Sequence, residues 1–161
     1  MFNRLLLDGL VPGSSGVNEN RAKFVLKRSG DETILVFRLD SSAGRQCLGL
    51  PGHSKAADAL LAVFRKSRRP VLLFVELKGS DVKHGMQQLQ STVQTVKKVL
   101  GNQWSRFEAF AVVVRSSGAS PKLGRDIKRL QTQMLKTLNT PATHMASVNG
   151  LTLDAVLKEL G

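Results

Sequence analysis

The segment Val71–Lys78 begins with five consecutive apolar residues and ends in Glu-Leu-Lys. A strand with one solvated face alternates apolar and polar residues, whereas a strand covered on both faces is apolar throughout. Val71–Val75 therefore predicts the central strand of a sheet that has structure packed on both sides. The 161 residues of the chain are enough for such an arrangement, because a globule of about 150 residues buries about two-thirds of its unfolded surface.

Strands are predicted throughout the first half of the chain. Ala22–Arg28 and Thr33–Leu39 flank the polar break Ser29–Glu32, which is typical of a hairpin connection. A second hairpin is predicted where Asp58–Phe64 and Val71–Lys78 flank a short loop with proline and charged residues. The first half is therefore expected to be rich in β-structure.

Strands and helices alternate in the second half. Between Asp81 and Leu100, apolar residues recur every three or four positions, as on one stripe of an amphipathic helix. The order predicts an α/β (α+β) fold, β-rich at first and then βαβαβα, with a mixed central sheet and flanking helices. We expect one domain of residues 1–161, partly flexible over residues 1–22. The other predicted elements are strands at Gln46–Leu50, Phe107–Arg115 and His144–Val148, and helices at Pro121–Asn139 and Thr152–Leu160.

The chain is strongly basic, with 24 Lys and Arg residues against 12 Asp and Glu residues and a formal charge of +12. Such an excess commonly serves a polyanion, because neutralising phosphates releases counterions and drives binding. We therefore expect a nucleic acid partner; a basic surface that only maintains solubility or contacts an anionic membrane is the alternative. Two clusters are candidate nucleic-acid contacts: Arg65, Lys66, Arg68 and Arg69 in the second hairpin loop, and Lys122, Arg125, Lys128 and Arg129 on the predicted helix Pro121–Asn139.

Several classes of protein are disfavoured. No apolar run approaches the roughly 20 residues of a membrane span, and the three leucines after Arg4 are too few for a signal peptide. We therefore expect a cytoplasmic protein without membrane contact. The single cysteine, Cys47, excludes an internal disulfide and a cysteine-based zinc site. The chain also lacks the Gly-x-x-x-x-Gly-Lys-Ser/Thr phosphate loop and the Gly-x-Ser-x-Gly nucleophile motif.

Polar residues end the predicted central strand. Glu76 and Lys78 are two positions apart, so both side chains point to the same face. A carboxylate and an ammonium at the end of an apolar strand are costly to desolvate unless they have a partner or a task. A five-residue hairpin loop would place Asp58 opposite Lys78 and on the same face, whereas a shift of one residue would move Asp58 to the other face.

Two carboxylates beside a lysine suit the hydrolysis of a phosphodiester. Asp58 and Glu76 would supply the oxygen ligands that Mg²⁺ and Mn²⁺ prefer, and the backbone carbonyl of Leu77 would supply a third. A bound metal ion stabilises charge on a phosphate and lowers the pKa of a bound water. Lys78 would orient or help deprotonate that water and offset negative charge in the transition state. A structural ion pair between Glu76 and Lys78 is the alternative.

This pattern also has a counterpart among known families. Asp58, a short hairpin, then Glu76-Leu77-Lys78 and a helix resembles the PD-(D/E)xK nuclease superfamily, and Val75–Val82 followed by Gln88 resembles one of its small bacterial branches. The resemblance covers about residues 56–115. It implies a restriction-endonuclease-like fold and a Mg²⁺- or Mn²⁺-dependent endonuclease that cleaves DNA, in a defence or repair system.

The resemblance also assigns roles to residues. It implies that Asp58 and Glu76 are metal ligands, that Lys78 is the catalytic lysine and that Gln88 is the glutamine of the following helix. Ala57 stands where the family has proline before the aspartate.

Further candidates are less closely tied to the motif. His84 precedes Gln88 by one helical turn and would share its face. Many family members use a glutamate from an N-terminal helix, for which Glu19 and Glu32 are candidates, with Glu19 favoured. Since one such domain makes one nick, we expect a homodimer or a partner protein in a larger complex. The alternative function is a non-catalytic nucleic-acid-binding or assembly subunit that retains the nuclease fold.

Overall fold

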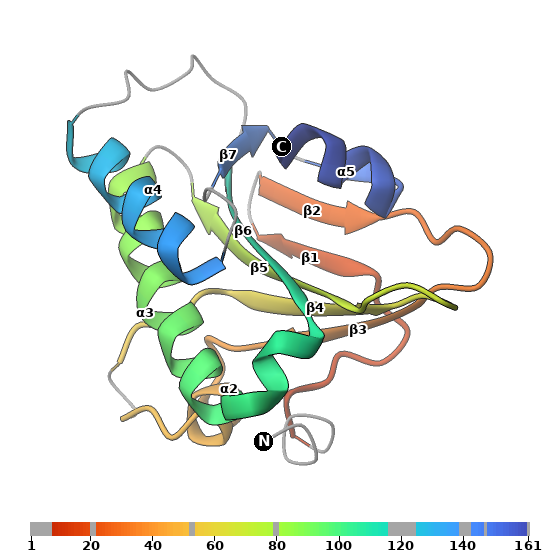
Figure 1. Cartoon of the computed structure of the whole chain (residues 1–161), viewed down its shortest axis with the longest axis horizontal. Coiled ribbons are helices and arrows are strands. Elements are labelled where there is room, and N and C mark those ends of the chain that lie inside the picture. Colours follow the sequence, from red (N-terminus) through yellow and green to blue (C-terminus); the bar gives the residue numbers. More distant parts are fainter. Residues whose placement is uncertain are drawn as a thin grey trace.

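A computed structural model of the chain describes residues 8–19, 22–51, 54–78, 81–115, 125–138, 143–146 and 148–160. The strands of this part of the chain form two mixed sheets (Figure 1). The larger sheet has the order β3 (Thr33–Arg38), β4 (Ala59–Phe64), β5 (Val71–Lys78), β6 (Glu108–Arg115) and β7 (Thr143–Ala146). The smaller sheet has the order β1 (Gly16–Glu19), β2 (Ala22–Leu26) and β8 (Val148–Leu151).

Both sheets combine antiparallel and parallel pairs. In the larger sheet β3, β4 and β5 are antiparallel neighbours, and β5, β6 and β7 are parallel neighbours. In the smaller sheet β1 pairs antiparallel and β8 pairs parallel with β2. The helices are α2 (Ser42–Cys47), α3 (Val82–Leu100), α4 (Arg125–Leu138) and α5 (Leu153–Leu160), with a 3₁₀ helix η2 (Gly101–Arg106) after α3. The prediction of an α+β chain with a mixed central sheet is confirmed.

The strand β5 is covered on both faces, as its apolar sequence predicted. Leu72 and Phe74 belong to the core formed with α3 and α4, whereas Leu73 and Val75 belong to the core formed with β2 and α5. Figure 1 shows α3 and α4 on one side of the larger sheet, and β1, β2 and α5 on the other. Because side chains alternate along a strand, Glu76 and Lys78 follow Leu72 and Phe74 onto the face that α3 covers.

The helix α3 also follows its sequence pattern. The Asp81 side chain accepts a hydrogen bond from the backbone N–H of His84 at 3.0 Å and caps the start of the helix. Gly101, with a φ of 51°, follows its last residue. The predicted apolar stripe is buried: it comprises Val82, Met86, Leu89, Val93, Val96 and Leu100. Among the described residues, no helix combines the length and the apolar composition that crossing a membrane requires.

The first predicted hairpin is wrong. β2 and β3 lie in different sheets: β2 pairs with β1 and with β8, whereas β3 pairs with β4. The strand β1 falls within residues 1–22, which were expected to be partly flexible; residues 1–7 lie outside the described part. Gly16 allows β1 to approach β2, because a Cβ at this position would lie 2.0 Å from the carbonyl oxygen of Phe24. The pairing with β8 joins distant parts of the chain, so local sequence does not reveal it.

Two shorter predictions also need correction. Gln46–Leu50 is not a strand, because Gln46 and Cys47 are the last residues of α2. This helix begins after Ser41, whose hydroxyl accepts a hydrogen bond from the N–H of Gly44 at 3.0 Å. A Cβ on Gly44 would lie 2.1 Å from the carbonyl oxygen of Arg38, so glycine lets α2 pack on the end of β3. The strand predicted at His144–Val148 is divided between β7 and β8, which belong to different sheets.

Candidate active site

The strands β4 and β5 pair two residues away from the predicted register. Ala59 lies opposite Val75, so the preceding residue, Asp58, reaches Glu76 and not Lys78. The hairpin loop is longer than predicted, with Ser67 at a φ of 57°, and its arginines bind groups outside the hairpin. A shift of two residues keeps each side chain on its original face, and Asp58 therefore remains beside Glu76 and Lys78.

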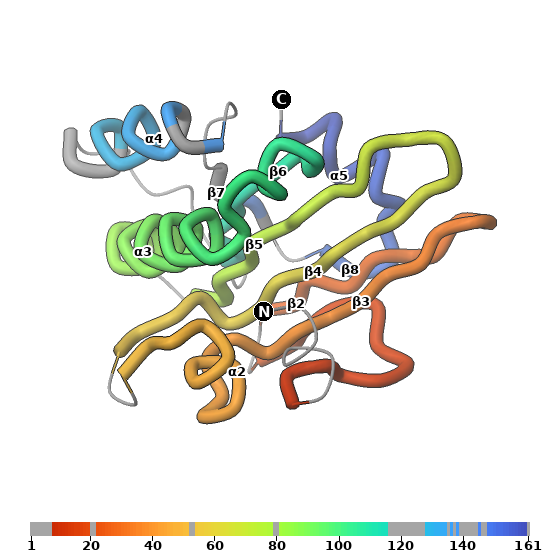
Figure 2. Tube along the Cα trace, turned by 60° about the horizontal axis from the view of Figure 1, so that its bottom comes forward, coloured from red at the N-terminus to blue at the C-terminus, as the bar shows by residue number. Residues whose placement is uncertain are grey.

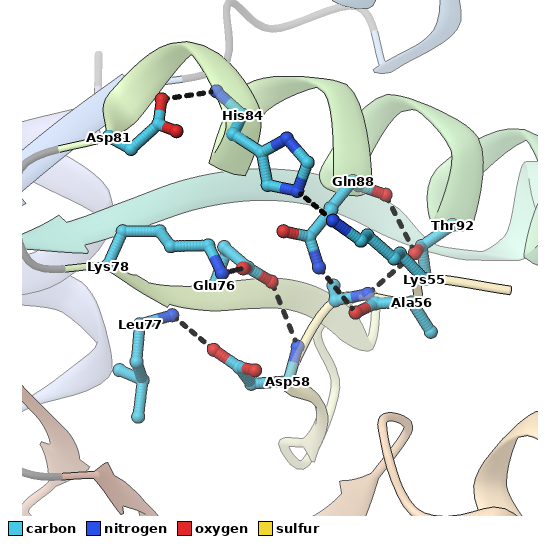
Figure 3. Close-up of polar contacts among 11 residues, drawn as sticks. Lys55, Ala56, Asp58, Glu76, Leu77, Lys78, Asp81, His84, Gln88 and Thr92 are labelled. Carbon is cyan, nitrogen blue, oxygen red and sulfur yellow. Dashed lines mark hydrogen bonds and ion pairs between the residues drawn. The ribbon is translucent and has the colours of Figure 1, made fainter. Parts of the chain in front are cut away.

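Reciprocal hydrogen bonds hold Asp58 and Glu76 together (Figure 3). The backbone N–H of Asp58 donates to Oε2 of Glu76 at 3.2 Å, and the backbone N–H of Leu77 donates to Oδ2 of Asp58 at 2.5 Å. Each carboxyl group thus accepts a hydrogen bond from the backbone of the other strand segment. This exchange fixes both carboxyl groups at the point where β4 begins and β5 approaches its end.

Lys78 completes the cluster. Its Nζ lies 2.8 Å from Oε1 of Glu76, whose side chain is 0% exposed, whereas the Lys78 side chain is 28% exposed. The helix α3 covers this pair closely at Gly85: a Cβ there would lie 3.1 Å from Cγ of Lys78 and 3.2 Å from Cγ of Glu76. An added Cβ would therefore crowd the ion pair and displace these side chains by a few tenths of an ångström, which glycine avoids.

Burial sets the protonation of the two acids. Desolvation raises the pKa of Asp58 to about 6, although the hydrogen bond from Leu77 lowers it; the negative charges of Asp40 and Glu19 raise it further. Desolvation, followed by the charge of Asp58, raises the pKa of Glu76 to about 7 against the lowering effect of Lys78. The cluster therefore holds two acids that ionise at higher pH than ordinary carboxyl groups do, and Glu76 titrates near neutral pH.

The surroundings of Lys78 favour its charged form. Burial lowers the pKa of the Lys78 ammonium, but the hydrogen bond to Glu76 and the charges of Glu76, Asp58 and Glu19 outweigh it and raise the pKa overall. Lys78 is therefore a cation at neutral pH.

Gln88 and Thr92 hold the segment that leads into Asp58. Nε2 of Gln88 donates to the carbonyl oxygen of Ala56 at 3.2 Å, and the N–H of Ala57 donates to Oγ1 of Thr92 at 2.8 Å. The Thr92 hydroxyl in turn donates to the carbonyl oxygen of Gln88 at 2.8 Å. Two polar side chains one helical turn apart on α3 thus bind the carbonyl and the N–H of one peptide group, the one that joins Ala56 to Ala57, shortly before Asp58. Gln88, a predicted catalytic residue, is engaged here as a positioning residue.

Thr92→Val is expected to lower the free energy of unfolding by about 1–3 kcal/mol, because it leaves the buried N–H of Ala57 without an acceptor. Urea unfolding measures this loss, and amide hydrogen exchange should become faster at Ala57. Thr92→Ser, which keeps the hydroxyl, is the matched control and should retain slow exchange at Ala57. Equal exchange at Ala57 in the valine and serine variants would contradict this role of the hydroxyl.

A pocket of about 330 Å³ opens beside the cluster. Asp58, Lys78, His84 and Gln88 all line it, so most of the predicted catalytic residues meet at one cavity. Nζ of Lys55 lies 3.0 Å from Nε2 of His84 at its edge. The other charged residues of its lining, which the sequence motif did not indicate, are Asp40 and Arg45.

The two candidate glutamates differ in their position relative to the carboxylate cluster. Glu19, at the end of β1, is close enough for its charge to raise the pKa of both Asp58 and Lys78. Glu32 lies in the connection between β2 and β3, where its Oε2 accepts a hydrogen bond from the N–H of Ser29 at 3.3 Å. It precedes the start of β3, which pairs with the end of β4 farthest from Asp58. The structure therefore brings Glu19, but not Glu32, towards the site.

The basic hairpin loop is not part of the site. It joins the ends of β4 and β5 opposite to Asp58 and Lys78 (Figure 2). Arg65, whose side chain is 11% exposed, contacts Asp154 on α5 at 2.6 Å. Arg69 donates to the carbonyl oxygens of Ser105 and Phe107 at 2.6 and 3.0 Å.

The other basic residues lie elsewhere. Arg68 lies 3.4 Å from Asp154, and Lys66 is exposed in the same loop. Lys128 and Arg129 are exposed on α4, and Arg129 lines a pocket of about 200 Å³ with Lys83 of α3. Lys122 and the side chain of Arg125 lie outside the described part of the chain. Nucleic-acid binding by either cluster stays a prediction.

The donor set at the cluster fits a hard metal ion. The N–H of Leu77 points to Asp58, and because N–H and C=O of one strand residue face the same neighbour, its carbonyl faces that side too. Two acids whose ionisation is disfavoured by burial would gain from a divalent cation between them. In the part of the chain that the structure describes, no three His, Cys, Asp or Glu residues are grouped to hold a metal ion. A metal ion here would therefore depend on two acids and a backbone carbonyl.

Comparison with known proteins gives no assignment. No family model matches the chain, and neither a curated protein nor a solved structure matches it. The function is therefore argued from the geometry of the cluster and its pocket.

Proposed function

We propose that the protein is a metal-dependent endonuclease that hydrolyses phosphodiester bonds of DNA, with a PD-(D/E)xK site on a restriction-endonuclease-like fold. The observation that carries the proposal is the meeting of Asp58, Glu76 and Lys78 at one end of the central strand, beside a pocket open to solvent. The charge of +12 supports a nucleic acid as substrate. Defence or repair is the setting we infer for such a nuclease.

Each residue has a role that its surroundings support. Asp58, Glu76 and the carbonyl of Leu77 would hold Mg²⁺ or Mn²⁺, which when bound polarises a phosphate and acidifies a coordinated water. Lys78 is protonated at neutral pH because its neighbouring carboxylates raise its pKa. It therefore donates hydrogen bonds and offsets negative charge on the phosphate, and it is poorly suited to remove a proton from water.

Metal affinity is expected to rise with pH. Below about pH 7 a proton occupies Glu76, and below about pH 6 a proton also occupies Asp58. Since a metal ion has to displace these protons, the dissociation constant for Mn²⁺ should increase at least about tenfold between pH 8 and pH 6. Isothermal titration with Mn²⁺ at several pH values measures this dependence.

The same titration tests the proposed function. Asp58→Asn should abolish the Mn²⁺ heat, whereas Glu32→Gln, which removes a carboxylate at the far end of the sheet, should leave it unchanged. Cleavage of DNA by the wild-type protein should require Mg²⁺ or Mn²⁺. Identical Mn²⁺ binding by wild type and Asp58→Asn, together with DNA cleavage in EDTA, would overturn the proposal.

One observation favours a second function, a non-catalytic nucleic-acid-binding or assembly subunit. The 2.8 Å contact with Lys78 already gives Glu76 a counter-charge, so the cluster can persist without a metal ion. Such a subunit would bind DNA in a salt-sensitive manner, without cleavage and without Mn²⁺ affinity that depends on Asp58. A nuclease that needs a second copy or a partner protein would bind Mn²⁺ but cut only in their presence.

A further inference from the structure

The pocket beside the cluster contains a concentration of cationic groups. Arg45 from α2, Lys55 from the segment before β4, and Lys78 from β5 all line it, together with His84 from α3. Asp40 and Asp58 are the acidic residues of the lining, so the three cations outnumber them. Side chains from three separate segments thus present positive charge to one cavity.

His84 positions Lys55 at the pocket. Nζ of Lys55 lies 3.0 Å from Nε2 of His84 (Figure 3), and because an ammonium group can only donate, the ring nitrogen is the acceptor in this contact. The contact with His84 uses one of the three ammonium protons, which leaves the others for a phosphate oxygen. Charge-assisted hydrogen bonds of this kind are strong.

The remaining lining offers little with which to recognise a base. Phe, Tyr and Trp are absent from the described residues that line the pocket. Two side chains of the lining that could read a base edge are already engaged within the protein: Arg45 donates to the carbonyl oxygen of Asp40, and Nε2 of Gln88 donates to that of Ala56. Bases are held by stacking on such rings or by contacts to their edges, whereas phosphate contacts position a strand without reading its sequence. The chemistry of the lining therefore matches the sugar–phosphate backbone.

We infer that this pocket is a backbone subsite, in which Lys55, positioned by His84, binds the phosphate next to the one that is cleaved, and that it reads no base. The inference rests on the proposed nuclease function, since it places a substrate strand beside Asp58. Lys55 lies three residues before Asp58, and the segment between them is fastened to α3 through Ala56 and Ala57. A phosphate bound by Lys55 is therefore held in a fixed relation to the carboxylate cluster.

Binding of fluorescein-labelled 12-nucleotide strands of dT, dA and dC, followed by anisotropy in EDTA, tests the subsite. Lys55→Ala should weaken binding about tenfold and reduce the slope of log K against log salt by about one. His84→Ala should weaken binding as well, and Lys55→Arg should restore most of the loss. The matched control is Lys98→Ala, which removes an exposed lysine in the last turn of α3, far from His84. It should change affinity less than twofold.

The affinities for the three strands and the effects of the two lysine variants decide whether the inference holds. Affinities for the three strands within about threefold of one another support a site that reads no base. Equal weakening by Lys55→Ala and Lys98→Ala would overturn the subsite, and a preference above tenfold for one strand would overturn its indifference to bases. Because the assay contains EDTA, its outcome is independent of cleavage. A protein that never cuts DNA would refute the nuclease proposal without changing the effect of Lys55→Ala.

Discussion

Glu76→Gln is expected to reduce metal-dependent DNA cleavage by more than about 100-fold, because losing a group that only supports a metal ligand already costs about 10–100-fold. Glu76 would be a ligand itself, and it also accepts the hydrogen bond that fixes the N–H of Asp58. Glutamine has nearly the same volume, so the close packing under Gly85 is preserved. Nicking of supercoiled plasmid with Mg²⁺ or Mn²⁺ measures the effect.

The controls separate loss of chemistry from loss of fold. Glu32→Gln should cut at the wild-type rate, since Glu32 lies in the connection between β2 and β3. The Glu76→Gln protein should remain folded at pH 8, because it no longer buries a carboxylate whose ionisation is disfavoured there. Full cleavage by Glu76→Gln would exclude this residue from the chemistry.

Lys78→Met is expected to make folding stability strongly dependent on pH. Removing the ammonium takes away the contact that lowers the pKa of Glu76, so that pKa rises further above about 7. A carboxyl group with a raised pKa in the folded state contributes its full stability below its unfolded pKa, and this contribution is lost as pH rises through the folded pKa. The variant should therefore lose about 3 kcal/mol relative to wild type at pH 8, as expected for a broken buried pair.

Urea unfolding at pH 5 and pH 8 measures this difference. At pH 5 Glu76 is largely protonated in the folded protein, and the variant should approach wild-type stability. The double variant Lys78→Met with Glu76→Gln should regain stability at pH 8, yet remain unable to cut DNA. A loss of the same size at both pH values would mean that the packing of the lysine stem, and not its charge, is what matters.

Strand periodicity made the centre of the site predictable. The alternation of side chains placed Glu76 and Lys78 on one face without any knowledge of tertiary structure. The position of Asp58 was obtained from an incorrect register, and its face was correct because the error was an even number of residues. The run Val71–Val75 likewise identified the buried strand, since only a doubly covered strand is apolar at every position.

Contacts between distant segments were not predictable. Thr92 binds the backbone 35 residues earlier, and nothing in its immediate sequence distinguishes it from an ordinary helix residue. The sole available signal was its spacing of four from Gln88 along α3. Lys55 and Asp40 lie outside regular elements, where no periodicity specifies a direction. The positive charge of the hairpin loop predicted a nucleic acid partner. In the structure, Arg65 forms an ion pair with Asp154 of the same chain.

The pairing of β2 with β8 has a consequence for the order in which the molecule assembles. Phe24 lies opposite Val148, so this contact closes a loop of 124 residues, from position 24 to position 148. Such long-range pairings are slow to form, because the entropy of closing the loop has to be overcome first. The carboxylate cluster and its helix need only β3–β6 and α3, a continuous stretch from Thr33 to Arg115. During synthesis on the ribosome, the part of the larger sheet that carries the carboxylate cluster can therefore form before the small sheet covers its opposite face.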